Sequence, residues 1–328
     1  MNAGARGEAA LIEAMKARVP HLPSPDGPGD DGAIVGAGPA RALTTDALIE
    51  GVHFLRAHPM GWLGHKALAV NLSDLAAMGA SPEAFTVSAA VPGAMPFAAW
   101  EALSDGMGEL ARASGCVLAG GDVVRSPGPL MLNITAWGPL AGPRPLTRTG
   151  GEPGDLVMVA GPIGRSGAGL TEWLALTSPA ADWSSAPLAA PSTALRAHLR
   201  PDPPLAAGPF ALHAGAHAAM DLSDGLAIDL PRLARASGVH LVVDLDALPA
   251  DPALPDASPD ARVCGGEDYS LVALVSPDRA SQFVDYGFAA IGHATAPAAT
   301  PVSYLRAGRP TQLLTRPFIH FDTDTDAG

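Results

Sequence analysis

The chain has 328 residues, of which 48% are apolar and only 16% are charged, and its formal net charge is −13. A chain of this length exceeds what one hydrophobic core usually serves, so we expect two domains. The acidic balance argues against general nucleic-acid binding, which requires a basic surface. The apolar runs are too short to span a bilayer, and two cysteines, Cys116 and Cys264, imply no disulfide framework. We therefore expect a cytoplasmic protein without nucleic-acid or membrane partners.

The first part of the chain alternates between helical and strand patterns. Apolar spacing predicts helices over 7–19, 60–79 and 97–114, and strands over 33–35, 41–45, 85–91, 116–119 and 130–137. Residues 20–32 are predicted to form a loop, because they are rich in Pro, Gly and Asp. The segment 138–154, which is rich in Gly and Pro, is the best candidate for a domain boundary.

A second run of alternating elements follows this boundary. We expect strands at 155–160, 239–244 and 269–275, a helix after the glycine-punctuated turn 161–169, and a strand followed by a helix within 217–237. Residues 178–204, rich in Ala, Pro and Ser, predict an irregular excursion. Alternating strands and helices in both halves indicate an α/β or α+β protein. The expected division is an N-terminal domain over 1–140, a C-terminal α/β domain over 150–321 and a solvated acidic tail over 322–328.

Aspartate is the most informative residue type, with 24 of the 33 acidic residues. Many aspartates stand singly behind a glycine or an apolar run, whereas a solvated acidic face mixes Glu and Asp with Lys and Arg. Mg²⁺ prefers such carboxylates as ligands, usually one or two per ion. A divalent metal would also allow an acidic pocket to hold a polyphosphate, because like charges a few ångströms apart repel. The pattern predicts an enzyme that uses magnesium and a phosphate compound.

The predicted helix 60–79 places Asn71, Ser73 and Asp74 among apolar neighbours. A carboxylate that is buried there needs a cation or hydrogen-bond donors. The alternative is that Ser73 and Asp74 cap a helix, but they stand well inside the apolar-periodic stretch. We interpret these residues as functional.

The segment 219–230 concentrates polar residues at a strand-to-helix turn. Asp221 belongs to the strand, and Ser223 or Asp224 is placed to cap the helix that follows. Capping needs one such residue, not three. Asp221 and Asp224 are spaced to share one metal ion or to hold two adjacent ones, whereas Asp229 is interpreted as a helix-surface residue.

Three glycine-rich segments are ambiguous by themselves. Gly120-Gly121-Asp122 and 265–268 are either tight turns or places where backbone N–H groups face a phosphate. The segment 161–169 resembles a phosphate loop, but no GxxxxGK[ST] motif occurs, so the chain is not a P-loop kinase. The histidines show no zinc spacing, and His53 is kept as a candidate because it follows shortly after Asp46.

Six blocks of the sequence together resemble the thiamine-monophosphate kinase family, in the same order and spacing. The most specific blocks are 64–80 and 219–226, and the others are 29–33, 44–54, 120–122 and 265–269. The family belongs to a superfamily with aminoimidazole ribonucleotide synthetase, selenophosphate synthetase and a hydrogenase-maturation dehydratase.

This resemblance implies a fold and an activity. The N-terminal α/β domain is expected to hold a four-stranded sheet that pairs with its twin in a homodimer. A C-terminal α/β domain packs beside it, with the nucleotide site in the cleft near the dimer interface. The implied reaction is phosphoryl transfer from ATP to thiamine monophosphate, giving thiamine diphosphate, with several Mg²⁺ ions.

The resemblance also implies roles for residues at matching positions. The magnesium-binding set is Asp30, Thr44, Thr45, Asp46, Asp74, Asp122, Asp221 and Asp224. The nucleotide contacts are Gly121, Asp122, Arg148 and Ser223, and the contacts to the thiamine substrate are His53, Glu267 and Phe318. Two positions depart from the family pattern: Ser104 stands where an aromatic residue often stacks on the nucleotide, and Ser270 replaces the usual acid.

The implied chemistry needs no catalytic base. The phosphate oxygen of thiamine monophosphate is already ionised near neutral pH and attacks the γ-phosphorus in line, so positioning and charge neutralisation supply the catalysis. The clustered carboxylates should repel one another and be partly protonated until metal arrives. The alternatives are a sister ATP-dependent enzyme of the superfamily, a phosphatase, and a non-catalytic nucleotide-binding regulator.

Overall fold

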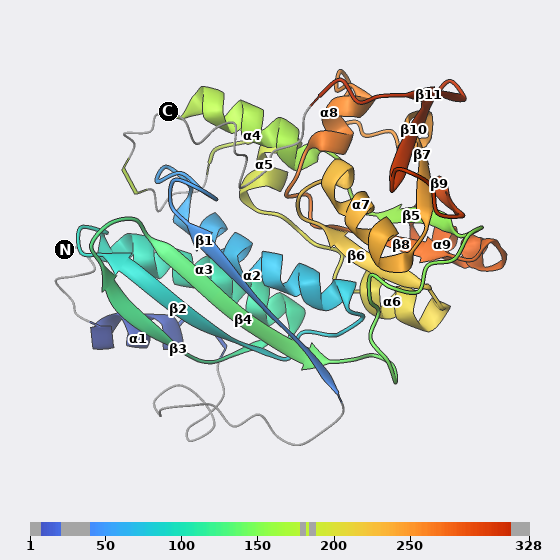
Figure 1. Cartoon of the computed structure of the whole chain (residues 1–328). Coiled ribbons are helices and arrows are strands. Elements are labelled where there is room, and N and C mark those ends of the chain that lie inside the picture. The colour runs from blue at the N-terminus through green and yellow to red at the C-terminus, as the bar shows by residue number, and fades with distance from the viewer. Residues whose placement is uncertain (1–7, 21–39, 178–181, 184–187, 316–328) are drawn as a thin grey trace.

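The computed structural model describes residues 8–20, 40–177, 182–183 and 188–315 (Figure 1). Its strands form two sheets, one of four strands in the order β1-β4-β2-β3 and one of seven in the order β11-β10-β7-β9-β5-β8-β6. Helices pack on these sheets, which confirms the mixed α/β class expected from the sequence. The predicted site residues Asp30 and Phe318 lie outside the described residues, as do the predicted strand 33–35 and the acidic tail.

The four-stranded sheet comes from the first part of the chain. Its strands are β1 (Arg41–Ile49), β2 (Ala84–Pro92), β3 (Val117–Ser126) and β4 (Met131–Pro139), and its helices are α1 (Glu8–Lys16), α2 (Met60–Ala77) and α3 (Phe97–Ser114). β2 and β3 run parallel, and the other pairs are antiparallel. α2 and α3 lie side by side, and the largest core cluster fills the space between these helices and one face of the sheet.

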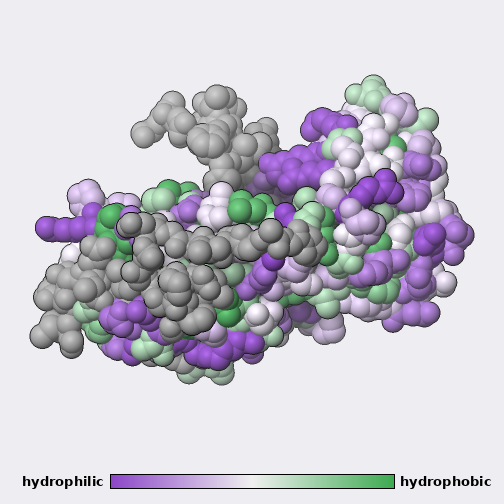
Figure 2. Space-filling view, turned by 90° about the horizontal axis from the view of Figure 1, so that it is seen from below, coloured by the Kyte–Doolittle hydropathy of each residue, from purple (hydrophilic) through white to green (hydrophobic). Residues whose placement is uncertain are grey.

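The opposite face of this sheet presents alternate residues of each strand. The pairing registers place Leu43, Val124 and Met131 together on this face, and all three are exposed. We call it the open face. Among the coloured residues of Figure 2, hydrophilic and hydrophobic residues are interspersed.

α2 is the central helix of the molecule. Of its 18 residues, 15 are buried, against α3 and the first sheet on one side and against β6, β8 and α6 on the other. Burial on all sides explains why its sequence is apolar almost throughout, since a surface helix would keep a polar face. Polar side chains on α2 must therefore find their partners within the protein.

The seven-stranded sheet comes from the second part of the chain. Its strands are β5 (Leu156–Ala160), β6 (Ala218–Leu222), β7 (His240–Asp244), β8 (Ser270–Val275), β9 (Ala289–Thr295), β10 (Val302–Arg306) and β11 (Arg309–Thr311). Its helices are α4 (Arg165–Leu176), α5 (Thr193–Leu199), α6 (Ala207–Ala214), α7 (Leu226–Ser237), α8 (Pro259–Cys264) and α9 (Ala280–Tyr286), with short 3-10 turns η2 (Leu245–Ala247) and η3 (Pro277–Arg279). β7 and β10 are parallel and the other pairs antiparallel.

Both faces of this second sheet are covered at its centre. One core cluster includes residues of α7, and another, on the other side, includes residues of α6 and α9. This explains why β6 and β8 are buried along their whole length. In the described part of the chain, no helix combines the length and the apolar character that crossing a membrane requires.

Two expectations about local structure were wrong. β3 does not end at residue 119 but continues through Gly120-Gly121-Asp122, so this segment is a strand and not a turn. A Cβ on Gly121 would lie 2.0 Å from the carbonyl oxygen of Val87, so the close pairing with β2 requires glycine. The second correction concerns 178–204, which contains the helix α5 rather than only irregular chain.

The long elements agree with the predictions, and several of the short ones were missed. The predicted helices 60–79 and 97–114 correspond to α2 and α3, and the strands 85–91, 130–137 and 155–160 to β2, β4 and β5. The elements missed were α6, α8, α9 and β9 to β11. Each spans only three to eight residues, which is too short for a periodic pattern to establish itself.

The crossing of α2 and α3 leaves no room for a side chain at Gly64. A Cβ there would lie 1.8 Å from the carbonyl oxygen of Leu103, whereas a Cβ on Gly61 would meet the Ala102 carbonyl at 3.4 Å. We expect Gly64→Ala to lower the free energy of unfolding by ~1–3 kcal/mol, because α3 must move away. Gly61→Ala is the matched control and should be neutral or stabilising by up to ~1 kcal/mol through helix propensity. Urea denaturation measures both, and equal stability of the two variants would contradict the close crossing.

Candidate active site

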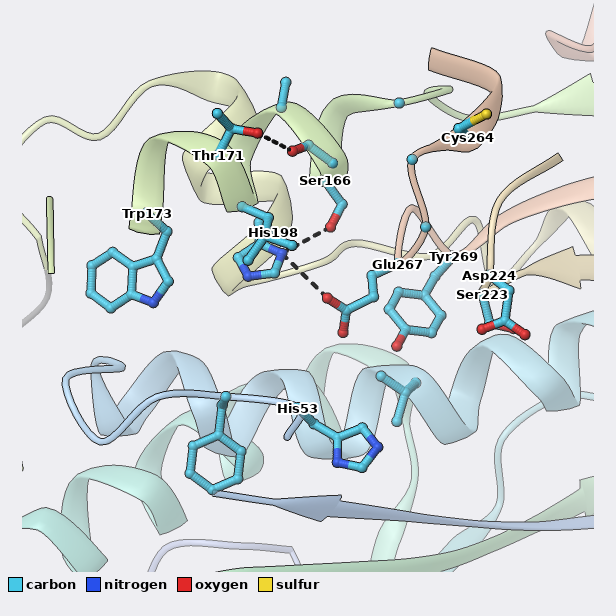
Figure 3. A pocket seen from close by; sticks show the side chains of 18 of the residues that line it. His53, Ser166, Thr171, Trp173, His198, Ser223, Asp224, Cys264, Glu267 and Tyr269 are labelled. Atoms are coloured by element: carbon cyan, nitrogen blue, oxygen red, sulfur yellow. Dashed lines mark hydrogen bonds and ion pairs between the residues drawn. The ribbon is translucent and has the colours of Figure 1, made fainter. Parts of the chain in front are cut away.

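A cavity of about 910 Å³ lies between the two parts of the molecule (Figure 3). Its walls come from the end of β1 and the turn that follows, from α2 and α4, from the β6–α7 turn and from the loop before β8. Eight predicted site residues line it: Asp46, His53, Asp74, Arg148, Asp221, Ser223, Asp224 and Glu267. The apolar lining includes Phe54, Leu55, Val70, Leu170, Trp173 and Leu174. The cavity therefore combines a carboxylate-rich lining with apolar walls.

Three hydrogen bonds tie the polar residues of α2 to the strands around it. They run from Thr44 Oγ1 to Asp74 Oδ2 (2.6 Å), from the Asp46 backbone N–H to Asn71 Oδ1 (3.0 Å) and from Ser73 Oγ to Asp221 Oδ2 (2.8 Å). The bonds link one helix to β1 of the first sheet and to β6 of the second. α2 continues to Ala77, so Ser73 and Asp74 are interior residues of the helix and the helix-cap alternative is wrong.

Three carboxyl groups of this cluster have raised pKa values, although only Asp221 is buried by its exposed area; Asp74 is half-buried and Asp46 is exposed toward the cavity. Burial, followed by the charge of the neighbouring Asp74, raises the pKa of Asp221 to about 8. Burial also raises the pKa of Asp74 to about 6, although the hydrogen bond from Thr44 opposes the rise. The pKa of Asp46 is raised by burial and by the charge of Asp224. Without a cation, the cluster therefore retains protons near neutral pH.

The turn between β6 and α7 is held by a residue that was misjudged from the sequence. Asp229 is fully buried, and its carboxylate accepts the backbone N–H of Asp224 (2.9 Å) and a bond from Arg232 (2.9 Å). Burial is the main cause that raises the pKa of Asp229 to about 6. Arg232 also pairs with the Asp224 side chain. Asp229 is thus a structural support of Asp224 and not a helix-surface residue.

The donors of this cluster suit a hard divalent cation. They are carboxylate and hydroxyl oxygens, and a cation would relieve the repulsion that helps to raise the pKa values of Asp74 and Asp221. Among the residues that the structure describes, no three His, Cys, Asp or Glu side chains converge into a complete metal site. Mg²⁺ needs only one or two carboxylates per ion when water and phosphate oxygens complete its shell. The residues therefore fit magnesium that binds together with an anionic ligand.

His53 and Glu267 each have close polar contacts with residues around them, of which Figure 3 marks the one between Glu267 and His198. The backbone N–H of Ile49 donates to His53 Nδ1 (3.0 Å), so the proton of the neutral ring is on Nε2. Glu267 Oε1 lies 2.8 Å from the ammonium of Lys66, and Glu267 Oε2 lies 3.3 Å from His198 Nδ1. Lys66 and His198 were not predicted from the sequence. A lysine inside the apolar run of α2 is the signal that could have indicated the first.

The glycine-rich segment 161–169 leads into α4, but the start of this helix already faces a carboxylate of the protein. The backbone N–H groups of Gly164 and Ser166 donate to Asp268, the latter over 2.8 Å. Burial raises the pKa of Asp268 to about 7, and these bonds oppose the rise. Asp268 thus stands where a phosphate loop would place its anion, which favours the other interpretation of this segment, an ordinary glycine-punctuated turn from strand to helix.

Two of the predicted magnesium ligands lie on the open face of the first sheet. Thr45 Oγ1 accepts a hydrogen bond from Thr135 (3.0 Å) of β4, so it points away from Thr44 and α2. The pairing registers place Asp122 on the same face as Thr45, and Asp122 is exposed. Neither residue lines the cavity, nor does Gly121.

Two other positions concern the nucleotide. Arg148 lines the cavity, and its charge is one of the causes that hold down the pKa of Asp74. Ser104 is fully buried in α3 and donates to the Trp100 carbonyl (2.9 Å). Ser104 is thus a core residue of α3, and it does not line the cavity.

Both parts of the chain match known domain families. Residues 29–140 match the N-terminal domain of AIR synthase related proteins, and residues 152–299 match the C-terminal domain of the same proteins. The two sheets and the cavity between them therefore define a two-domain protein of the AIR synthase related class.

Named relatives show to which family within this class the chain belongs. The thiamine-monophosphate kinase of Mycobacterium tuberculosis H37Rv is 38% identical over 75% of this chain and 74% of its own length. That of Escherichia coli K12 is 37% identical over 90% of this chain and 92% of its own. The solved structure of AaThiL complexed with AMPPCP and TMP has a TM-score of 0.75, with 28% identity over 98% of this chain and 99% of that chain. The chain belongs to the thiamine-monophosphate kinase family.

The metal-free protein should lose stability as the pH rises toward the pKa of Asp221. The folded-state pKa of about 8 exceeds the ordinary value of 3.8, so between these values the native state keeps a proton that the unfolded state has released. In chelator, we expect Asp221→Asn to raise the melting temperature at pH 8, by roughly 2–4 °C per kcal/mol recovered, and to leave it unchanged at pH 4. Calorimetry at both pH values measures the difference. A variant less stable than wild type at pH 8 would contradict the raised pKa.

Proposed function

We propose that this protein catalyses the ATP-dependent phosphorylation of thiamine monophosphate to thiamine diphosphate. The observation that carries the proposal is the cluster of Asp46, Asp74 and the buried Asp221 in a cavity that also has apolar walls. Such carboxylates suit the cations that accompany a polyphosphate, and apolar walls suit the rings of thiamine. The named kinase relatives, and AaThiL solved with TMP and AMPPCP, an ATP analogue, support the same reaction.

Several Mg²⁺ ions would be held by the aspartates of the cavity. The proposed ligands there are Asp46, Asp74, Asp221 and Asp224, with Thr44 beside them and with Asp30, Thr45 and Asp122 as further members of the set. Bound magnesium neutralises phosphate charge, which a chain of net charge −13 cannot do with its own cations. The raised pKa values of Asp74 and Asp221 support this assignment, since a cation would replace the protons that they retain.

The protein itself would act by positioning. A phosphate monoester has a second pKa near 6, so its oxygen is a competent nucleophile at neutral pH and no catalytic base is required. The residues must then hold two anions in line and keep water out. Arg148 and Ser223 in the cavity are the proposed nucleotide contacts, together with Gly121 and Asp122 on β3. Because Asp268 occupies the start of α4, the phosphates would lie at the aspartate cluster and not at that helix.

The thiamine moiety would lie against the remaining walls. His53 offers an Nε2–H donor and Glu267 a carboxylate acceptor, which suit the ring nitrogens and the amino group of the pyrimidine. Phe54 and Trp173 provide apolar surface beside them. Phe318 remains a proposed contact outside the described residues.

We also propose a homodimer that forms through the open face of the first sheet. Leu43, Val124 and Met131 are exposed there, and a face that meets a partner is where exposed apolar residues are expected. Thr45 and Asp122 lie on the same face. Pairing of two such faces would bring these predicted ligands to an interface, which agrees with a nucleotide site near the partner subunit.

The cysteines support a cytoplasmic location. Cys116 and Cys264 are both free and buried, and they lie in different parts of the fold. Reduced, unpaired cysteines are typical of cytosolic proteins. ATP as the phosphoryl donor is consistent with that compartment.

Transfer of ³²P from γ-labelled ATP to thiamine monophosphate tests the activity directly. We expect labelled thiamine diphosphate with Mg²⁺ and none with excess chelator, because the carboxylates cannot accept two anions without a cation. ADP formed only with an aminoimidazole-type acceptor would assign a sister activity. Release of free phosphate alone would indicate a phosphatase, and the absence of turnover would indicate a nucleotide-binding protein.

Asp74→Asn should lower kcat by a factor on the order of 10²–10³, since it removes a charge from the proposed magnesium site. The amide oxygen still accepts the bond from Thr44, so the fold should persist, as a thermal melt would show. Asp285→Asn is the control, because Asp285 is exposed on α9 and away from the cavity. A folded Asp74→Asn protein with the wild-type rate would exclude Asp74 from the site.

Leu43→Asp should dissociate the proposed dimer. Leu43 is 68% exposed on the open face, and a buried aspartate at a subunit interface would be costly. Leu176→Asp on α4 is the matched control, because Leu176 is 66% exposed but lies away from the first sheet. Light scattering after size exclusion should give a monomer for Leu43→Asp and a dimer for Leu176→Asp and the wild type. A wild-type monomer would refute the proposed pairing.

A further inference from the structure

Lys66 is a charged residue in the most buried helix of the molecule. It is 0% exposed and lies in α2, and it is one of only two lysines in the chain. Taking an ammonium group out of water is costly unless a carboxylate and further acceptors surround it. A lysine retained in such a place requires an explanation that apolar packing does not provide.

The partners of Lys66 come from the other part of the molecule. Its ammonium lies 2.8 Å from Glu267 Oε1 and donates to the backbone carbonyl of His198 at 3.3 Å. Glu267 stands in the loop before β8, and His198 is in α5. The ion pair therefore joins α2 to the segment that forms one wall of the cavity.

The other ionisable groups near Lys66 are neutral. Burial, and then the charge of Lys66, lowers the pKa of His198 to about 2 and that of His58 to about 3. Within the described residues, Glu267 is the carboxylate that pairs with Lys66. Among the described residues, Lys66 therefore forms its ion pair with Glu267 alone.

Glu267 has an unfavourable backbone conformation and a partly exposed side chain, so its orientation depends on contacts with other residues. Its backbone has a φ of 65°, which is unfavourable for a residue with a Cβ, and its side chain is 28% exposed in the cavity. Its second oxygen lies 3.3 Å from His198 Nδ1, and that nitrogen lies 3.0 Å from Ser166 Oγ (Figure 3). One oxygen of Glu267 is therefore held by α2, and the other by a pair from α5 and α4.

We propose that Lys66 is a positioning residue, which pairs with the Glu267 carboxylate and fixes its orientation toward the thiamine moiety of the substrate. This inference rests on the proposed function, in which Glu267 contacts that moiety. Lys66 itself does not line the cavity, so it acts through Glu267. Its loss should weaken the binding of thiamine monophosphate and leave the aspartate cluster, and hence the binding of ATP, unchanged.

Steady-state kinetics of Lys66→Met, Glu267→Gln and the double variant test the proposal. Methionine keeps the length of the side chain and removes the charge. We expect each single variant to raise KM for thiamine monophosphate about tenfold, the loss typical of one charge-assisted hydrogen bond, with KM for ATP and kcat within about twofold of wild type. The double variant should have the KM of Glu267→Gln alone, because Lys66 acts only through that residue.

Asp155→Asn is the structural control. Asp155 is buried, bonds to the Glu152 N–H and to His217, and does not line the cavity. This variant should melt at a lower temperature and keep both KM values. If Lys66→Met does not fold, the KM for thiamine monophosphate of Glu267→Gln is compared with that of the double variant, in which no carboxylate is left unpaired. Equal KM values in these two variants support the proposal.

Two results would overturn the inference while the proposed function stands. One is a folded Lys66→Met protein with the wild-type KM for thiamine monophosphate. The other is a double variant whose KM increase equals the product of the two single increases, which would show that Lys66 and Glu267 act independently. A wild-type protein that does not turn over thiamine monophosphate would instead refute the proposed function, and this inference with it.

Discussion

The constraint on which the rest of the structure depends is the burial of α2, in which 15 of 18 residues are buried. This helix lies between the two sheets, so each polar side chain on it must be satisfied by a specific partner. Those partners come from β1, from β6 and from the loop before β8. The same contacts that remove the cost of burial therefore bring together carboxylates and donors from distant parts of the chain. The cavity lies between the elements that these contacts connect.

The charge of the cavity is the reason for proposing that the kinase depends on a metal ion. An acidic protein that binds two phosphate compounds faces repulsion between like charges, and the cavity adds to it by burying Asp74 and Asp221 together. The raised pKa values of Asp74 and Asp221 have burial as their first cause and this repulsion as a further one. A hard cation would remove this repulsion, since it would neutralise the charge of the carboxylates and that of the phosphates at the same time. In the proposed function, the apolar walls and the Lys66–Glu267 pair would contact the thiamine moiety of the substrate.

Much of the site could be predicted because its residues stand in short, specific blocks. Asp74, Asp221 and Glu267 were found in this way, and all three line one cavity. The errors arose where a side chain could point in more than one direction. The helical pattern predicted Asp229 to be a surface residue, yet it is buried and its carboxylate accepts the backbone N–H of Asp224. Residues 161–169 were ambiguous between a phosphate loop and an ordinary turn, and only the packing of Asp268 against the start of α4 distinguishes the two.

The sequence by itself determined the class of chemistry and the long elements. Isolated aspartates, few lysines and apolar runs of helical or strand period are properties of the chain, and they hold wherever it folds. The tertiary structure decided which side chains meet. Thr44 and Thr45 are neighbours, but a strand sends successive side chains to opposite faces, so one reaches Asp74 and the other the open face. Lys66 could be located in the sequence, but its partner Glu267 could not, because local periodicity carries no information on contacts between residues far apart in the chain.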